Sequence, residues 1–255
     1  MRENKFNELS PQDWLKFTKT WFVHRPKPRK EAEKLHPAKF PESLAEEFIL
    51  FFTKKGEIVL DPFAGTGSTL VACDDTGRNG IGIELMEKYA EIARRRTKQK
   101  VIVGNALKVD ELVHEQVDFV ITSPPYGPML NKKGLVQRKR VDERLDVTYG
   151  DDSADLGNIK DYEKFVDAVY EVFRKVKGIL KEGKYIVIIL QNYRDGKVYR
   201  TLAWDVARRL MSDYILVGER LWCQDNKTLY PYGLGYSYVP NVHHHYCLVM
   251  RKLMI

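Results

Sequence analysis

Residues 58–69 read Ile-Val-Leu-Asp-Pro-Phe-Ala-Gly-Thr-Gly-Ser-Thr, and the rest of the chain is organised around them. The apolar run at the start of this stretch ends on Asp61, and a turn of small residues follows. Ser68 or Thr69 can cap a helix that begins there. The stretch therefore predicts a strand, a tight turn and a helix.

The turn also has the features of a ligand site. Gly65 and Gly67 remove the side chains that would keep a ligand away from the backbone, and N–H groups at the start of a helix suit an anionic group. Asp61, at the carboxyl end of the strand, can accept from an ammonium or a hydroxyl. Together these features fit an amino-acid head group better than a pyrophosphate. The alternative is an ordinary tight connection between a strand and a helix.

A second motif, Ser123-Pro124-Pro125-Tyr126, follows the apolar strand predicted at residues 117–122. Two successive prolines remove two backbone donors and stiffen the turn, so carbonyl oxygens are the polar groups that it offers. Such carbonyls can accept from an amino group, and the tyrosine ring offers a surface on which a flat base can stack. The alternative is a rigid proline turn beside a core tyrosine. Because the Ser-Pro-Pro-Tyr motif follows the Asp-Pro-Phe-Ala-Gly-Thr-Gly motif along the chain, the pair favours a binding site.

These motifs resemble those of S-adenosylmethionine-dependent amino-methyltransferases. The similarity is to the Ser-Pro-Pro-Tyr type, the cytosine-N4 nucleic-acid methyltransferases, in a compact archaeal-like form. It extends over roughly residues 36–251, and the cofactor motifs precede the catalytic motif, an order permuted relative to many DNA enzymes of the family. The matching segments are His36–Pro41, Asp61–Thr69, Gly82–Glu84, Gly104–Ala106 and Ser123–Tyr126.

The resemblance implies S-adenosylmethionine as the cofactor. Glu84 ends a predicted strand, where an acid can accept from both ribose hydroxyls, and Asn105 is expected at the adenine edge. The alternative for Glu84 is an acid at the start of the helix predicted from Met86 to Thr97. The expected cofactor-binding residues are Lys39, Phe40, Pro41, Asp61, Phe63, Gly65, Thr66, Gly67, Ser68, Thr69, Glu84, Asn105 and Ala106.

The expected catalytic residues are Ser123, Pro124, Pro125 and Tyr126. An exocyclic amine on a base is a poor nucleophile because its lone pair is delocalised into the ring. We expect Ser123 and the Pro124 carbonyl to bind the amine hydrogens, and Tyr126 to hold a flipped base by stacking. The cysteines, Cys73, Cys223 and Cys247, are absent from any Pro-Cys turn, which argues against methylation at the cytosine ring carbon.

Strands alternate with helices along the chain, which predicts an α/β fold with its ligand at the carboxyl ends of the strands. The resemblance implies a Rossmann-like class I methyltransferase, with a doubly wound, mostly parallel, seven-stranded sheet and an antiparallel last strand. We expect one methyltransferase domain over residues 1–255. It would carry an N-terminal helix and basic arm (1–35), a basic loop (128–160) and a tyrosine-rich hairpin (224–243).

Nucleic acid is the expected partner. The formal net charge of +7 favours a polyanion. Stacking on bases suits the tyrosine-rich hairpin, and the basic loop is well placed to close over nucleic acid. A merely solvated surface, or a disordered loop, is the alternative. The expected nucleic-acid-binding residues are Lys132, Lys133, Arg138, Lys139, Arg140, Tyr232 and Tyr236.

The resemblance implies an enzyme that methylates the 4-amino group of cytosine. Structured ribosomal RNA is favoured because the chain has no large inserted recognition region, which implies RNA binding and rRNA processing. The runner-up is an orphan enzyme of DNA methylation acting on cytosine 4-amino or adenine 6-amino groups. A nucleotide-dependent oxidoreductase is disfavoured because the third glycine of the dinucleotide pattern is missing. An inactive nucleic-acid-binding protein is disfavoured by the intact Ser-Pro-Pro-Tyr turn.

The remaining properties concern location and metal. Hydrophobic residues make up 44% of the chain and charged residues 30%, as in globular proteins. No apolar run approaches the roughly 20 residues of a membrane span, and no signal region follows Met1, so we expect a cytoplasmic protein with no membrane partner. His243, His244 and His245 would face alternately on a strand, so we expect no metal site there.

Overall fold

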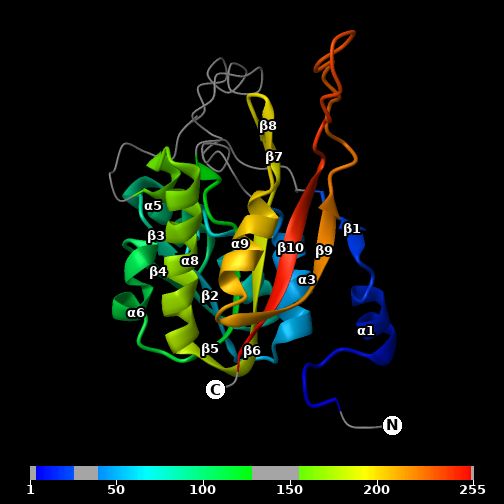
Figure 1. Ribbon diagram of the computed structural model, residues 1–255. Coiled ribbons are helices and arrows are strands. Elements are labelled where there is room, and N and C mark those ends of the chain that lie inside the picture. The colour runs from blue at the N-terminus through cyan, green and yellow to red at the C-terminus, as the bar shows by residue number, and fades with distance from the viewer. Residues whose placement is uncertain (1–3, 26–39, 128–154, 254–255) are drawn as a thin grey trace.

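The computed structural model describes residues 4–25, 40–127 and 155–253. Its centre is a sheet of eight strands (Figure 1). In their order across the sheet, the strands are β1 (Trp21–Val23), β9 (Tyr214–Cys223), β10 (His244–Lys252), β6 (Leu180–Leu190), β5 (Val117–Thr122), β2 (Ile58–Asp61), β3 (Asn79–Glu84) and β4 (Lys100–Val103).

The strand directions confirm the predicted α/β class. The strands β6, β5, β2, β3 and β4 are parallel to one another. The last strand, β10, is antiparallel to both of its neighbours, β6 and β9. The order reverses beside β2, where the crossovers pass to opposite sides, and this is where an open α/β sheet binds its ligands.

The sheet has one strand more than the seven predicted from the sequence. The additional strand, β1, pairs in parallel with Leu221–Cys223 at the edge of the sheet. It has three residues, and only Phe22, in the middle, is buried. Three residues are too few to show a period of two, and their partner lies about 200 positions away, so the local sequence carries no sign of this pairing.

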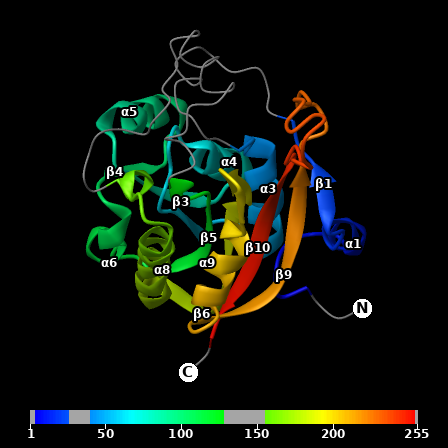
Figure 2. The same ribbon diagram turned by 45° about the horizontal axis from the view of Figure 1, so that its top comes forward.

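Helices cover both faces of the sheet (Figures 1 and 2). One face carries α1 (Pro11–Phe17), α3 (Glu42–Phe52) and α4 (Ser68–Thr76), with α5 (Glu87–Arg96) beside α4. The other carries α6 (Val109–Leu112), α8 (Tyr162–Ile179) and α9 (Leu202–Leu210). Two single turns, η1 (Ala106–Lys108) and η3 (Leu156–Asn158), lie in connections, and β7 (Tyr193–Asp195) pairs with β8 (Val198–Arg200) in a separate hairpin.

Alternation along the central strands explains the two apolar cores. On β6, Ile186 and Ile188 pack into the core under α8 and α9, whereas Val187 and Ile189 pack into the core under α3. Successive side chains of a strand point to opposite faces, so a strand buried on both faces is apolar throughout.

Two hairpins project beyond the carboxyl ends of the central strands (Figures 1 and 2). One is the β7–β8 hairpin. The other is the connection between β9 and β10, residues 224–243, which we call the arm. Asn241 closes its base, because its side chain accepts from the backbone N–H of Tyr230 at 2.9 Å and donates to the Tyr230 carbonyl at 2.9 Å. Among the described residues, none of the helices is long and apolar enough to cross a membrane.

Candidate functional site

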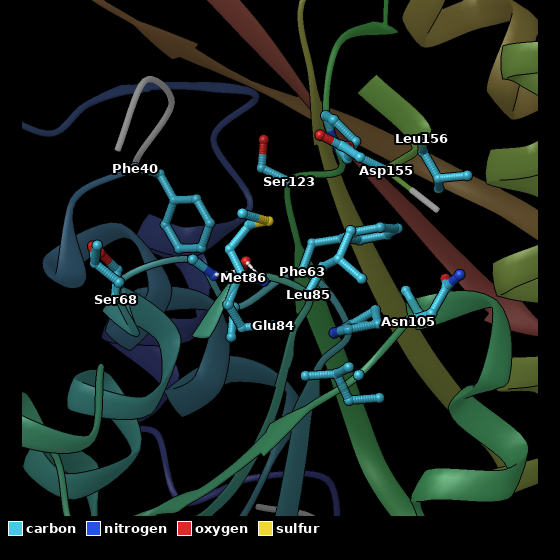
Figure 3. Close-up of a pocket in the computed structure, with 18 residues that line it drawn as sticks. Phe40, Phe63, Ser68, Glu84, Leu85, Met86, Asn105, Ser123, Asp155 and Leu156 are labelled. Carbon is cyan, nitrogen blue, oxygen red and sulfur yellow. Dashed lines mark hydrogen bonds between the residues drawn. The ribbon is translucent and has the colours of Figure 1, made fainter. Parts of the chain in front are cut away.

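A pocket opens at the carboxyl ends of β2, β3, β4 and β5 (Figure 3). Its empty space, which includes open solvent at its mouth, is about 790 Å³. Ten of the residues expected from the sequence line it. They are Phe40, Phe63, Gly65, Thr66, Ser68, Glu84, Asn105, Ala106, Ser123 and Pro125.

Glu84 lies at the centre of this pocket, at the end of β3 (Figure 3). One carboxylate oxygen accepts from the backbone N–H of Gly65 at 2.8 Å, and the other from that of Met86 at 2.9 Å. Burial raises the pKa of Glu84 to about 7, although these two hydrogen bonds act in the opposite direction. Each carboxylate oxygen has two acceptor positions, so both can still accept from a ligand hydroxyl.

Asp61 lies beneath the turn and outside the pocket lining, which differs from the direct ligand contact that the sequence predicted. It is 1% exposed and accepts from the hydroxyls of Thr69 and Thr122, each at 2.5 Å. It also accepts from the backbone N–H of Phe63 at 3.0 Å. Burial raises the pKa of Asp61 to about 6. Its carboxylate thus joins β2, α4 and β5 below the site.

Gly67 is also behind the pocket wall, and its role there is steric. Its φ of +83° favours glycine, and a Cβ built on it would lie 3.0 Å from the Cβ of Ala93 in α5. The missing side chain therefore lets the start of α4 approach α5. Among the other residues expected to bind the cofactor, Thr69 lies behind the wall with Asp61, Pro41 precedes α3, and Lys39 lies outside the described residues.

An arginine that the sequence argument missed ties this turn to its neighbours. Arg96, at the end of α5, donates to the Thr66 carbonyl at 2.5 Å and to Glu42 at 2.5 Å. Ser68 donates to the same Glu42 oxygen at 3.1 Å. Arg96 is the last of three successive arginines in α5, and its sequence neighbourhood does not distinguish it from the other two.

The Ser-Pro-Pro-Tyr turn forms the opposite end of the pocket. Ser123 and Pro125 line the pocket, whereas Pro124 and Tyr126 do not. The hydroxyls of Ser123 and Tyr126 lie 3.1 Å apart. Tyr126 is only 6% exposed, and burial raises its pKa above the ordinary value. The sequence predicted that this ring would face a base, but in the structure it faces the protein interior.

Asp155 is a second residue that the sequence argument did not select. It lines the pocket near Ser123 in Figure 3. One of its oxygens accepts from the backbone N–H of Gly157 at 2.7 Å, which caps the single turn η3. It follows a polar stretch with several other aspartates, so the sequence gives no reason to choose it over them.

The nucleic-acid-binding residues expected from the sequence divide into two groups. Tyr232 is 41% exposed and Tyr236 is 98% exposed, and both lie on the arm with Tyr238, which is 87% exposed. The five basic residues, Lys132, Lys133, Arg138, Lys139 and Arg140, lie outside the described residues. Within the part of the chain that the structure describes, no group of three or more His, Cys, Asp or Glu side chains is placed to hold a metal ion.

Comparison with known proteins gives consistent matches. A family model for N6 and N4 methyltransferases, described as DNA methylase, matches residues 2–95. Type II methyltransferase M.BglI of Bacillus subtilis is 36% identical over 114 residues, which cover 44% of this chain and 32% of that protein. The orphan methyltransferase M.BamHII of Bacillus amyloliquefaciens is 44% identical over 73 residues, covering 29% of this chain and 28% of that protein. These matches therefore span about a third or less of each relative's length.

Solved structures share the fold. TrmN from Thermus thermophilus superposes with a TM-score of 0.57 and 15% sequence identity, over 88% of this chain and 52% of that chain. At this level of identity the likeness concerns the fold alone. The pocket of this chain lies outside the carboxyl ends of parallel strands, where open α/β sheets bind their ligands.

Proposed function

The chain belongs to the family of S-adenosylmethionine-dependent amino-methyltransferases acting at N6 or N4, and from this premise we propose that it methylates an exocyclic amine of a nucleic-acid base. The favoured target is the 4-amino group of cytosine in structured RNA. The observation that carries this proposal is that Ser123 and Pro125 line the same pocket as Glu84 and the Gly65 turn.

The residues present fit S-adenosylmethionine. Glu84 has acceptor positions for ribose hydroxyls, and Phe63, Ile83 and Ala106 give the pocket an apolar lining suited to a purine ring. Asn105 lines the same region and can pair with a base edge. The small residues at the start of α4 offer room and backbone N–H groups to a carboxylate. When bound, the cofactor supplies an electrophilic methyl group.

The Ser-Pro-Pro-Tyr turn, at the other end of the pocket, would bind the amine that is to be methylated. Ser123 would accept a hydrogen bond from the amine and so favour a tetrahedral nitrogen whose lone pair points into the pocket. The Pro124 carbonyl, which lies outside the pocket lining, would have to turn toward the amine to accept its second hydrogen. The nitrogen loses a proton as it is methylated, and Asp155, on the same wall, is a carboxylate that can accept it. Most of the rate enhancement would come from positioning.

The choice of base and polymer rests on different observations. The serine of Ser-Pro-Pro-Tyr favours cytosine, because adenine enzymes more often carry Asp or Asn at this position. Structured RNA is the proposed polymer because its unpaired bases are open to recognition. DNA is the second candidate, and the description of the matching family model as DNA methylase favours it.

The nucleic acid would lie over the pocket mouth. Tyr232 and Tyr236 of the arm would stack on bases. Lys132, Lys133, Arg138, Lys139 and Arg140 would contact phosphates. A target base must leave its stack to reach a recessed pocket, as in other enzymes that modify bases.

Transfer of a tritiated methyl group tests the proposal. The purified protein is incubated with labelled S-adenosylmethionine and either total RNA or genomic DNA, and the nucleosides are then separated. We expect label in N4-methylcytidine from RNA. Label in N4-methyldeoxycytidine or N6-methyldeoxyadenosine from DNA would support the DNA enzyme. Label on a ring carbon, or no label in either polymer, would contradict the proposal.

A further inference from the structure

The strands β1, β9 and β10 lie side by side at the base of the arm (Figure 1). Toward the arm, buried and partly exposed side chains alternate along each of them. On β1, Phe22 packs into the core under α3, whereas Trp21 is 50% exposed and Val23 is 39% exposed. Successive side chains of a strand point to opposite faces, so the partly exposed ones share the face of the sheet opposite α3.

The register aligns these side chains in two rows across the three strands. Tyr246 on β10 is paired with Leu221 on β9, and Leu221 is paired with Trp21 on β1. The next row is built in the same way. We call this face the platform, and its members are Trp21, Leu221 and Tyr246 in one row and Val23, Cys223 and His244 in the next.

Aromatic rings continue the platform toward α9 and the β7–β8 hairpin. The ring centroid of Tyr246 lies 5.1 Å from that of His244 and 5.4 Å from that of Trp204, near the start of α9. Tyr199, on β8, is 42% exposed. Burial raises the pKa of its hydroxyl, and the nearby hydroxyls of Tyr246 and Tyr238 raise it further. The β7–β8 hairpin therefore borders the platform on one side, with the arm close by.

Basic side chains lie at both borders of the platform. At the outer border, the ammonium of Lys19 lies over the Trp21 ring, 3.4 Å from its centroid. At the other border, Arg194 and Lys197 are exposed on the β7–β8 hairpin. Exposed rings flanked by cations suit a ligand that combines flat bases with phosphates.

We propose that the platform binds unpaired bases of the nucleic-acid substrate, next to the nucleotide that is methylated. This inference rests on the proposed function, because it concerns where the rest of that substrate lies. Bases stack on exposed aromatic rings with little regard to sequence, and RNA-recognition modules hold single strands on a sheet face that carries aromatic residues. In a duplex the base faces are already stacked on one another, so a duplex offers none to the platform.

The platform lies within reach of the pocket. Thr122, at the end of β5, is paired with Ile188 on β6, and Leu190, two residues farther along β6, is paired with Tyr246. Neighbouring strands lie about 4.8 Å apart, so Tyr246 is roughly 10 Å across the sheet from the end of β5, and Trp21, two strands farther, is roughly 20 Å from it. One strand of nucleic acid can therefore place a base in the pocket and nearby bases on the platform.

Fluorescence anisotropy with a short labelled RNA, single-stranded or paired with its complement, tests the proposal. We expect the wild-type protein to bind the single strand more tightly than the duplex. Trp21→Ala should weaken single-strand binding roughly fivefold, the lower end of the loss for one stacked base, and Trp21→Phe, which keeps a ring, should weaken it less. Cofactor affinity should stay the same. Tighter binding of the duplex, or unchanged single-strand affinity in both Trp21→Ala and Tyr199→Ala, would overturn the inference.

Leu15→Ala is the matched control. Leu15 is also exposed, at 69%, but lies on α1, which covers the opposite face of the sheet. Its loss should leave single-strand affinity unchanged. Equal losses of affinity in Leu15→Ala and Trp21→Ala would show a general effect of removing an exposed apolar side chain and would overturn the inference.

Tryptophan fluorescence reports on the platform without any methylation. A base stacked on an indole quenches its emission, so single-stranded RNA should quench the wild-type protein, and the quenching should be smaller in Trp21→Phe. Equal quenching in the two proteins would overturn the inference. A second copy of the chain is the competing occupant, and a dimer that dissociates in Trp21→Ala, detected by light scattering, would overturn the inference as well.

These measurements separate the platform from the proposed function. If the wild-type protein methylates no nucleic acid but prefers single strands and is quenched through Trp21, the proposed function is rejected and the platform stands. If methylation occurs while single-strand affinity and quenching are the same in Trp21→Ala as in the wild-type protein, the proposed function stands and the platform is rejected.

Discussion

The two ends of the pocket differ in how they are held. At the glycine turn, three charged side chains fix the backbone from different sides: Asp61 from below, Glu84 across the pocket and Arg96 from α5. At the Ser-Pro-Pro-Tyr end, two prolines stiffen the backbone, and one hydrogen bond joins Ser123 to Tyr126. Charged side chains thus fix the backbone of the glycine turn from several sides. The Ser-Pro-Pro-Tyr end is a rigid turn on which one group, the hydroxyl of Ser123, can rotate.

This difference corresponds to what each end would bind. A cofactor is the same molecule in every turnover, so a network that fixes its site in advance lowers the cost of binding it. In the proposed reaction, a target base would arrive as part of a polymer and leave methylated. Changes at the first end should therefore appear mainly in cofactor affinity, and changes at the second mainly in turnover.

The largest expected effect comes from removing the carboxylate at the centre of the network. Glu84→Ala should weaken S-adenosylmethionine binding by roughly 1.5–3 kcal/mol, the range for a charged hydrogen-bond partner. The backbone N–H groups of Gly65 and Met86 would also lose their acceptor. Isothermal calorimetry measures this change. Glu84→Gln, which keeps one acceptor oxygen, should lose less binding free energy. Unchanged affinity in both variants would show that Glu84 does not bind the cofactor.

The next largest effect is expected in the pH dependence of cofactor affinity. Burial raises the pKa of Glu84 to about 7 in the protein without cofactor, and ribose hydroxyls would donate best to the ionised form. Cofactor affinity should therefore rise roughly tenfold from pH 6 to pH 8. Stability has the opposite sign, because the folded state holds this proton more tightly than the unfolded state, so the free energy of unfolding should fall over the same interval. If the S-adenosylmethionine affinity of Glu84→Gln kept the same pH profile, a group other than Glu84 would be responsible for the titration.

The sequence could predict the parts of the site that depend on local order. The strand ends at Glu84 and Ser123 were visible because an apolar run stops at a polar residue or a proline. The inward position of Asp61 was not, because its partner Thr122 lies 61 residues away and only the parallel sheet brings them together. The buried ring of Tyr126 likewise depends on His245 and Trp222 in the last two strands. Tertiary partners of this kind leave no periodic pattern near either residue.

A smaller effect, on affinity for RNA, is expected from a substitution in the arm. Tyr236 is 98% exposed, so Tyr236→Ala should leave Tm unchanged. If the ring stacks on a base, affinity for RNA should fall by about 1 kcal/mol, at the lower end of the range for one stacked base. Fluorescence anisotropy with a labelled single strand measures the change. Val217→Ala is the control, since Val217 is also exposed, at 56%, but lies on β9 away from the arm. Equal losses in both variants would argue against a specific stacking role.

The smallest effect is expected from a conservative change in the network. Arg96→Lys keeps the charge but cannot reach both the Thr66 carbonyl and Glu42 with one planar group. Cofactor affinity should fall roughly two- to threefold, with kcat unchanged at saturating cofactor. Steady-state kinetics separate the two parameters. A fall in kcat with unaltered cofactor affinity would contradict the expectation that changes at the glycine turn affect cofactor binding rather than turnover.

The most direct test of the central claim is a single-turnover reaction with S-adenosylmethionine that carries a deuterated methyl group. The wild-type enzyme and Ser123→Ala are each mixed in excess over RNA, and the nucleosides are analysed by mass spectrometry. We predict that the wild-type enzyme places the deuterated methyl group on the cytosine 4-amino nitrogen, and that Ser123→Ala binds cofactor normally but transfers it far more slowly. Equal transfer rates in the two proteins, or a methyl group on a ring carbon, would contradict the assignment of this pocket to amine methylation.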